Sequence, residues 1–222
     1  MLLMTAALNA SAQNSQTREV SGFNSVASAG PFNVHIKLDG TESLKIDADP
    51  GIINEIETTV KDGALKISFK DHNYWNKNAG KIDIYVTAKS LSGLVNSGSG
   101  SIKVDGLIST DNFKAVLSGS GNITTSVKSD GLHAVISGSG SIKLSGDAND
   151  ADIVVTGSGE LNGKDLKTSS SQVTITGSGN VHVAANKSVS AHIIGSGSVV
   201  YSGNATVSDA KYIGSGRMTK ED

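Results

Sequence analysis

The sequence predicts an all-β solenoid, a single-stranded parallel β-helix with coils of about 19 residues. Seven copies of Gly-Ser-Gly occur between Gly98 and Gly216, at successive spacings of 21, 19, 19, 20, 18 and 19 residues. A fixed period of this size is typical of repeats in which each unit forms one coil. Apolar residues alternate on both sides of each copy with a period of two, which is the period of a strand and not of a helix. Each copy therefore predicts a strand, a sharp corner and a second strand.

The alternation separates inward from outward positions. Around Gly138, Ala134, Ile136 and Ile142 occupy the apolar positions that recur in the other copies, and these positions are predicted to face inward. The positions between them, such as Lys143, are predicted to face outward. Coils stacked at about 4.8 Å place equivalent residues above one another, so the inward positions predict continuous apolar ladders.

Glycine is expected at the corners because a sharp corner favours positive φ and leaves no room for a Cβ. The serine between each pair of glycines is predicted to hydrogen-bond the backbone of the corner. The predicted corner glycines are Gly98, Gly100, Gly119, Gly121, Gly138, Gly140, Gly157, Gly159, Gly177, Gly179, Gly195, Gly197, Gly214 and Gly216.

The first twelve residues, MLLMTAALNASA, predict a short signal peptide over residues 1–12. Ala10-Ser11-Ala12 fits the small-x-small rule for cleavage before Gln13, although a basic n-region is missing. Residues 13–17 are predicted to be a polar linker. The apolar stretch is too short to span a membrane, and no other segment comes close, so we expect no transmembrane segment. We therefore expect export to the periplasm, the cell surface or the extracellular medium.

A single domain is expected over residues 18–218, irregular over 18–90 and regular, with the Gly-Ser-Gly coils, over 91–218. In the irregular part, strands are predicted at 18–23, 32–36, 44–46 and 82–86. Asp49-Pro50 predicts a helical turn, with Asp49 as the N-cap. Residues 56–60 and 64–69 flank an Asp-Gly turn and predict a hairpin.

Several motifs occur in a characteristic order: Arg-x-Val-x-Gly-Phe-x-x-Val from Arg18, Gly-Pro-Phe-Asn-Val from Gly30, Asp-Gly-Ala-Leu-Lys-Ile from Asp62, and the serial Ser-Gly-Ser-Gly-x-Ile. Together they resemble the family described as putative auto-transporter adhesin, head GIN domain, which is common in Bacteroidetes-type bacteria and was long a domain of unknown function. The resemblance extends over about residues 18–218. It implies a right-handed β-helix that is exported to the cell surface, and it supplies no catalytic residues.

Composition narrows the function classes. The formal net charge is −2, with 19 basic and 21 acidic residues interspersed, which argues against binding nucleic acid or acting as a polybasic membrane binder. The absence of Cys excludes disulfides and thiol chemistry. The Gly-Ser-Gly copies open strands instead of helices, so they do not match phosphate-binding loops, and we expect no cofactor.

No metal site is expected either. The acidic cluster over residues 147–152 lacks the central Gly and distal Glu of a calcium-binding loop, and we interpret it as a solvated turn, with opportunistic Ca²⁺ binding as the alternative. The five histidines have no metal-ligand spacing and are expected on the surface. They are His35, His72, His133, His182 and His192.

Candidate ligand-binding residues fall in two places. Tyr74 and Trp75, the sole Trp, lie in a polar loop and suit stacking on a sugar ring, although Trp75 could instead pack over the solenoid. The outward ladder after the corner contains Asn122, Glu160 and Asn180 among hydroxyl side chains. One carboxylate among amides and hydroxyls suits hydrogen bonds to sugars better than acid–base catalysis.

These observations favour an exported, non-enzymatic binding or adhesion module for a carbohydrate or another cell-surface polymer, with no catalytic residues. Two alternatives stay open. Polysaccharide lyases and hydrolases share the β-helix architecture, so a polysaccharide-active enzyme is the first. The second is a structural protein that forms a homo-oligomer, because the edge of a terminal coil invites pairing.

Overall fold

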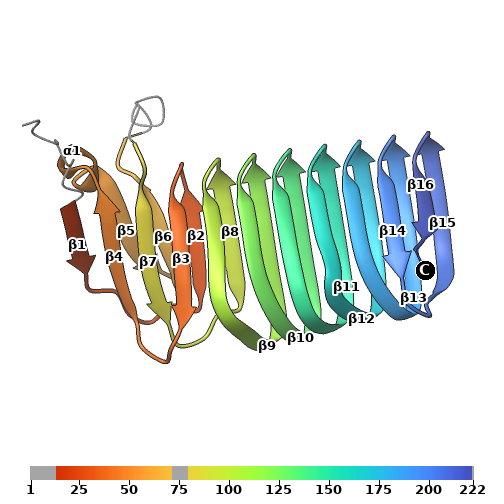
Figure 1. Cartoon of the computed structure of the whole chain (residues 1–222), viewed down its shortest axis with the longest axis horizontal. Coiled ribbons are helices and arrows are strands. Elements are labelled where there is room, and N and C mark those ends of the chain that lie inside the picture. Colours follow the sequence, from red (N-terminus) through yellow and green to blue (C-terminus); the bar gives the residue numbers. More distant parts are fainter. Residues whose placement is uncertain (1–13, 72–79, 222) are drawn as a thin grey trace, which may run out of the picture.

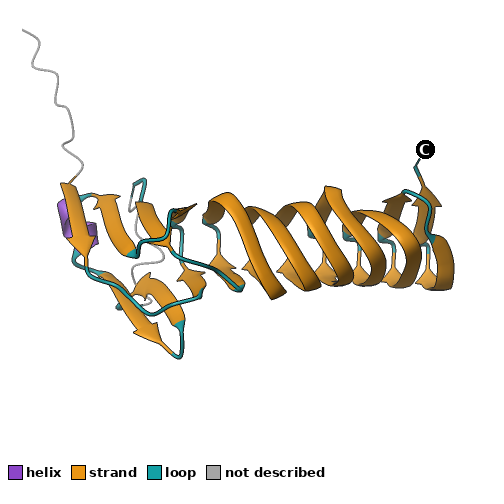
Figure 2. Cartoon of the chain, turned by 90° about the horizontal axis from the view of Figure 1, so that it is seen from below, coloured by secondary structure: helices purple, strands orange, loops and turns teal. Residues whose placement is uncertain are grey.

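The computed structural model describes residues 14–71 and 80–221, and it is an elongated β-solenoid of about seven turns (Figure 1). Strands contain 75% of the residues and helix 2%. The spacing between equivalent positions is about 19 residues, so the predicted fold class is confirmed. In the second half of the chain the ribbon winds continuously around the long axis (Figure 2). The residues of the predicted signal peptide, 1–12, lie outside the described residues.

The strands form two faces on opposite sides of the core. The first face has the order β1-β4-β7-β3 followed by β9 to β14 and β16, and the second has β5-β6-β2-β8 followed by the later halves of β9 to β13 and β15. The bounds are β1 Asn14–Arg18, β2 Ser25–Ala29, β3 Asn33–Leu38, β4 Ser43–Ala48, β5 Ile56–Lys61, β6 Ala64–Phe69, β7 Asp83–Ala88, β8 Gly93–Gly98, β9 Ser101–Gly119, β10 Asn122–Gly138, β11 Ser141–Gly157, β12 Glu160–Gly177, β13 Asn180–Gly195, β14 Ser198–Ser202, β15 Thr206–Gly214 and β16 Arg217–Lys220.

The register between coils follows the repeat. Ile123 pairs with Ile102 of the coil before and with Ile142 of the coil after, and all three side chains are buried. The outward positions, Lys143 among them, are exposed. The predicted inward and outward assignment is therefore confirmed, and the inward ladders form one continuous core.

The glycine corners form the edge at which the arrowheads of β9 to β13 lie in Figure 1. The first glycine of each copy has positive φ, from 111° to 157°. The second does not, but a Cβ on it would lie closer than 3.0 Å to an atom of the neighbouring coil. Glycine is thus required at the first position by both conformation and close approach, and at the second by close approach alone.

The prediction for the corner serines is wrong. The side chains of Ser120, Ser139 and Ser158 are exposed, and among the described residues their hydroxyls make no hydrogen bond. Instead, the carbonyl oxygens of the preceding coil's glycines accept from the corner N–H groups; Ser139 N, for example, donates to Gly119 O over 3.0 Å. Because backbone groups satisfy one another, the hydroxyls stay free.

The opposite edge is a rounded bend through which the strands run without a break. Register shifts between Thr124 and Ser126, and between Lys143 and Ser145, turn the chain here, as β-bulges do. The acidic segment 147–152 lies inside β11 at this bend. Its interpretation as a turn between strands is therefore wrong, because the ladder of hydrogen bonds continues through it.

The N-terminal part interleaves distant strands. β3 lies between β7 and β9, and β2 lies between β6 and β8. The predicted hairpin is confirmed, with β5 and β6 antiparallel and both turn residues, Asp62 and Gly63, at positive φ. The predicted helical turn is α1, Pro50–Ile53, although the side chain of its N-cap residue Asp49 makes no capping hydrogen bond.

The predicted polar linker over residues 13–17 is wrong where the structure describes it. Residues 14–18 form β1, which pairs antiparallel with β4. Arg18 fixes the strand end, since its Nη1 donates to Ile56 O over 2.7 Å and its Nη2 to Ile53 O over 2.9 Å. Because the backbone of these polar residues is paired in a sheet, β1 closes the N-terminal end of the first face.

The C-terminal coil, formed by β15 and β16, has no further coil beside it among the described residues. Its inward positions are consequently exposed: Tyr212 is 43% exposed, whereas its neighbour in the previous coil, Ile193, is 1% exposed. Lys220 occupies the inward position beside the buried Tyr201. No helix in the described part of the chain is long and apolar enough to cross a membrane.

Candidate functional site

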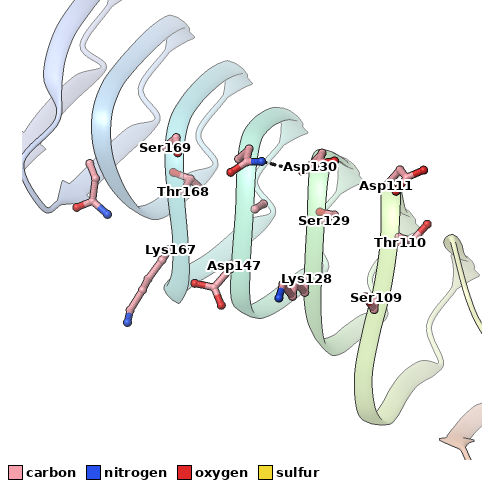
Figure 3. A pocket seen from close by; sticks show the side chains of 13 residues that line it. Ser109, Thr110, Asp111, Lys128, Ser129, Asp130, Asp147, Lys167, Thr168 and Ser169 are labelled. Atoms are coloured by element: carbon pink, nitrogen blue, oxygen red, sulfur yellow. Dashed lines mark hydrogen bonds between the residues drawn. The ribbon is translucent and has the colours of Figure 1, made fainter.

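A groove of about 530 Å³ runs along the rounded edge over five coils (Figure 3). Each of the strands β9 to β12 contributes three consecutive residues, and β13 contributes one. The lining residues are Ser109, Thr110, Asp111, Lys128, Ser129, Asp130, Asp147, Ala148, Asn149, Lys167, Thr168, Ser169 and Asn186. A hollow that crosses several coils follows the solenoid axis and suits an extended ligand.

Small side chains create the hollow. The middle residues of the four triplets are Thr110, Ser129, Ala148 and Thr168, and the last three of these are buried. The Thr168 hydroxyl is held by Ser171 Oγ at 2.8 Å and by Ala184 O at 3.0 Å. Because these residues are short and fixed, the charged residues on either side of them form the two walls of the groove.

One wall alternates in charge. Lys128, Asp147 and Lys167 are register neighbours on successive coils, and all three are exposed. Among the described residues, no ion pair joins them to one another or to another side chain. Their ammonium and carboxylate groups are therefore available as donors and acceptors along the groove.

The other wall is made of Asp111, Asp130, Asn149 and Ser169, at the corresponding positions of successive coils. Asn149 Nδ2 donates to Asp130 Oδ1 over 2.7 Å, the bond drawn in Figure 3. This bond orients the amide and carboxylate side by side at the rim. The groove thus combines two lysines with carboxylate, amide and hydroxyl groups at the spacing of the coils.

A second hollow, of about 640 Å³, lies on the second face beside the groove and contains the pair of His133 and Asp152. His133 Nδ1 lies 2.9 Å from Asp152 Oδ2. A carboxylate on Nδ1 is the arrangement that orients a catalytic histidine. Ser170, Ser188 and Ser190 line the same hollow, but no hydrogen bond in the described part of the chain joins a hydroxyl to His133.

The predicted ladder after the corner is present. Asn122, Glu160 and Asn180 stack in register with the interspersed serines, and Ser198 Oγ donates to Asn180 Oδ1 over 2.6 Å. None of the three residues lines a hollow described above. Tyr74 and Trp75 lie outside the described residues, so the structure does not place them. Within the described residues, no group of three or more His, Asp or Glu is arranged to hold a metal ion.

The groove is not apparent from the sequence alone. Lys128, Asp147 and Lys167 look like ordinary outward residues in a period of two, and only their shared register reveals a wall. A detectable signal is the short residue between two polar ones, which recurs at the same point of three successive coils as Ser129, Ala148 and Thr168. Tyr85 and His35, which stack on the first face, were missed as well.

A family model described as putative auto-transporter adhesin, head GIN domain, matches residues 22–205. The chain belongs to this family. The recognition made from the N-terminal motifs and the Gly-Ser-Gly repeats is therefore confirmed. A comparison with curated protein sequences finds no match.

Solved structures share the head GIN fold. A putative adhesin from Bacteroides fragilis is 24% identical with a TM-score of 0.86, covering 94% of this chain and 97% of its own. A putative lipid binding protein from Parabacteroides distasonis is 23% identical with a TM-score of 0.75, and a putative adhesin from Parabacteroides merdae is 21% identical with a TM-score of 0.73. Each of these two matches covers 96% of this chain and 98% of the other. At these identities the likeness shows a common fold.

Proposed function

We propose that this head GIN domain is an exported, non-enzymatic binding module that holds an extended carbohydrate or other surface polymer in the groove of the rounded edge. The observation that supports this most directly is the pair of in-register polar walls that line the groove on successive coils. Successive coils offer equivalent groups at about 4.8 Å intervals, so a polymer can make repeated contacts along the axis.

The chemistry of the walls suits sugar hydroxyls. Lys128 and Lys167 donate hydrogen bonds, Asp111 and Asp147 accept them, and Asn149 does both. Charge-assisted hydrogen bonds are the stronger kind, which makes these groups effective anchors on a polar ligand. Each contact on an open groove is weak, so affinity is expected to grow with the length of polymer that the groove holds.

The enzyme alternative has less support. Glycoside hydrolysis requires two carboxyl groups on either side of the scissile bond, one of them an acid with a raised pKa. In the groove, Asp147 instead stands between two lysines and Asp130 hydrogen-bonds an amide. Asp111 and Asp130 are neighbours along the same wall and do not lie on opposite walls. The His133–Asp152 pair has no hydroxyl partner among the described residues. We therefore assign these groups to binding.

The adhesin description of the family, and that of two structural neighbours, agrees with a surface ligand. Another neighbour is described as a lipid binding protein, which makes lipid the competing ligand class to test. The groove walls carry charges and amides instead of an apolar lining, and this favours a polar polymer over an acyl chain.

Binding to immobilised dextran, alginate and peptidoglycan fragments, with phosphatidylcholine vesicles as the lipid arm, tests the proposal. We expect retention on at least one polysaccharide, no release of reducing ends or unsaturated products, and affinity that rises with oligosaccharide length. Lys128→Ala/Lys167→Ala should weaken binding at least about tenfold. The matched control, Lys66→Ala/Lys143→Ala, removes two exposed lysines outside the groove and should bind as wild type does.

Three results contradict the proposal. If the protein is retained on vesicles only, its ligand is a lipid. If reducing ends or unsaturated products are released, the protein is an enzyme. Equal loss of binding in the groove variant and the control shows that general charge, and not the groove, binds the polymer. Circular dichroism of each variant verifies that the strands are intact.

A further inference from the structure

A third hollow, of about 480 Å³, lies on the first face where β7, β3 and β9 run side by side. Its lining residues are His35, Ile36, Lys37, Tyr85, Val86, Thr87, Lys103 and Asp105. It is separate from the groove and from the hollow of His133. Its residues come from three strands that are far apart in sequence but adjacent in the sheet.

Two stacked rings form one side of this hollow. Tyr85 and His35 are register neighbours, their ring centroids are 5.1 Å apart, and the ring planes differ by 19°. Rings that stack across adjacent strands stand upright on the sheet and present their edges outward. Lys45 Nζ lies 5.3 Å from the Tyr85 centroid on the other side of the ring, a cation–π contact.

Further contacts hold the stack in place. His35 Nε2 lies 3.4 Å from Asp83 Oδ1, and the side chain of Asp83 is only 5% exposed. Asp83 Oδ2 also pairs with Lys81 Nζ at 3.0 Å. Tyr85 nevertheless remains 43% exposed, so a pre-oriented aromatic ring is open to solvent at this point of the face. A rigid, exposed aromatic side chain binds with little loss of conformational entropy.

The rest of the hollow has a backbone floor and a polar rim. The backbone of Ile36 and Val86 forms the floor, because the side chains of these residues belong to the core and are only 2% and 1% exposed. Lys37, Lys103, Asp105 and Thr87 form the rim and supply two ammonium groups, a carboxylate and a hydroxyl. A pyranose ring has the complementary chemistry, because its C–H groups can contact the exposed edges of the Tyr85 and His35 rings and its hydroxyls can bond to the rim. We propose that this hollow is a subsite for one pyranose ring, neutral or acidic.

This inference rests on the proposed function, and β9 connects the two sites. Lys103 and Asp105 line the pyranose subsite, and Ser109, four positions after Asp105, begins the groove. The groove starts at β9 because the preceding strands β3 and β8 do not extend around the bend. A polymer that leaves the groove toward the N-terminal end therefore has the Tyr85 subsite as its next contact.

The test uses methyl glucoside, methyl N-acetylglucosaminide and methyl glucuronide as probes, followed by NMR of the tyrosine and histidine side chains. We expect at least one probe to shift the ring signals of Tyr85 and His35. Tyr85→Ala should weaken that binding at least about tenfold, while Tyr85→Phe, which keeps the ring, should retain most of it. Tyr212→Ala is the matched control, because Tyr212 is also 43% exposed but lies in the C-terminal coil.

Three sets of results overturn the subsite, and they differ in what they say about the groove. If no probe shifts Tyr85 and a bound polysaccharide is still lost in Lys128→Ala/Lys167→Ala, the pyranose subsite is wrong and the groove proposal stands. If Tyr85→Ala and Tyr212→Ala weaken binding equally, general aromatic exposure accounts for it. If wild-type protein binds neither the probes nor any polysaccharide, both proposals fail.

Discussion

The backbone of Gly138 lies so close to that of Gly119 that a Cβ on Gly138 would stand 2.5 Å from the Gly119 carbonyl oxygen. Gly138 also has φ of 121°, where L-residues are strained. Both effects act at once, and the obstacle is backbone, which cannot rotate away. The corner therefore does not accept a side chain at Gly138 unless the backbone moves.

We accordingly predict that Gly138→Val and Gly157→Val each lower the free energy of unfolding by more than about 2 kcal/mol. Lys103→Ala and Lys143→Ala, on exposed outward positions, should stay within about ±0.5 kcal/mol. Urea unfolding followed by circular dichroism measures both. Corner and outward variants with the same midpoint would refute the steric argument.

A second prediction concerns Asn96, which is fully buried at a position where later coils have Leu117 and Ile136. Its Nδ2 donates to Gly100 O over 2.8 Å and to Asn122 O over 3.3 Å, while its Oδ1 has no partner among the described residues. Asn96→Asp should lower the free energy of unfolding by at least about 2 kcal/mol, because the variant loses the two N–H donors and buries a carboxyl group.

Asn96→Leu is the informative companion. The variant removes two hydrogen bonds, but it also removes the unpartnered Oδ1 and introduces the residue type found at Leu117 of the next coil. We therefore expect the free energy of unfolding to change by no more than about 1 kcal/mol. The midpoints of urea unfolding of Asn96→Asp and Asn96→Leu, each compared with wild type, measure both effects. Equal, large losses would mean that the amide fixes the first corner in a way that an apolar side chain cannot replace.

A third prediction concerns acid stability at Glu42. Its carboxylate accepts from Lys89 Nζ over 2.6 Å and from the N–H groups of Gly22 and Phe23, and the Lys89 hydrogen bond is the main reason why the pKa of Glu42 lies below its usual 4.5. A lowered folded-state pKa contributes stability that is present above 4.5 and lost as the pH falls through the folded value.

Glu42→Gln should therefore be less stable than wild type at pH 7, and the difference in stability should shrink as the pH falls below 4.5 through the lowered pKa of Glu42. The urea midpoint as a function of pH measures it. Glu57→Gln, at an exposed residue, is the control and should track wild type throughout. If the difference in stability between Glu42→Gln and wild type does not change with pH, the packing of the side chain and not its charge accounts for the effect.

A fourth prediction concerns the C-terminal coil. Lys220 places a charge at an inward position, and the register shift between Val207 and Asp209 interrupts the edge of β15. Inward charges and bulges are common protections against edge-to-edge pairing. Lys220→Val should therefore increase self-association, measured as mass by light scattering during size-exclusion chromatography. Lys143→Val, on the exposed first face, is the control; a similar shift there would implicate added surface hydrophobicity.

Much of the fold follows from the repeat alone. Gly-Ser-Gly specifies the corner, the period of two specifies which side chains enter the core, and the spacing specifies the coil. These signals are local, so Ile123, Ile136 and Ile142 could be placed inward without any structure. The strand order of the N-terminal part could not be predicted, because β3 joins β7 and β9 through contacts that no local pattern encodes.

The candidate sites depend on register, which explains why they were missed. Asp105 and Ser109 are outward residues of an ordinary strand until β-bulges turn the chain between the first face and the groove. Tyr85 becomes an exposed platform only because His35, 50 residues earlier, is its neighbour in the sheet. The ladder of Asn122, Glu160 and Asn180 was predicted with the right register, but none of these residues lines one of the three hollows.

The interleaved N-terminal strands also set an order of folding. Each regular coil closes a loop of about 19 residues, whereas joining Asn33 to Ser101 spans 68. The longer closure costs about 1 kcal/mol more in chain entropy, and it needs β9 as a template. Regular coils are therefore expected to nucleate first and the N-terminal strands to join last. Synthesis runs the other way, so the strands made first remain without their partners until the middle of the chain has emerged.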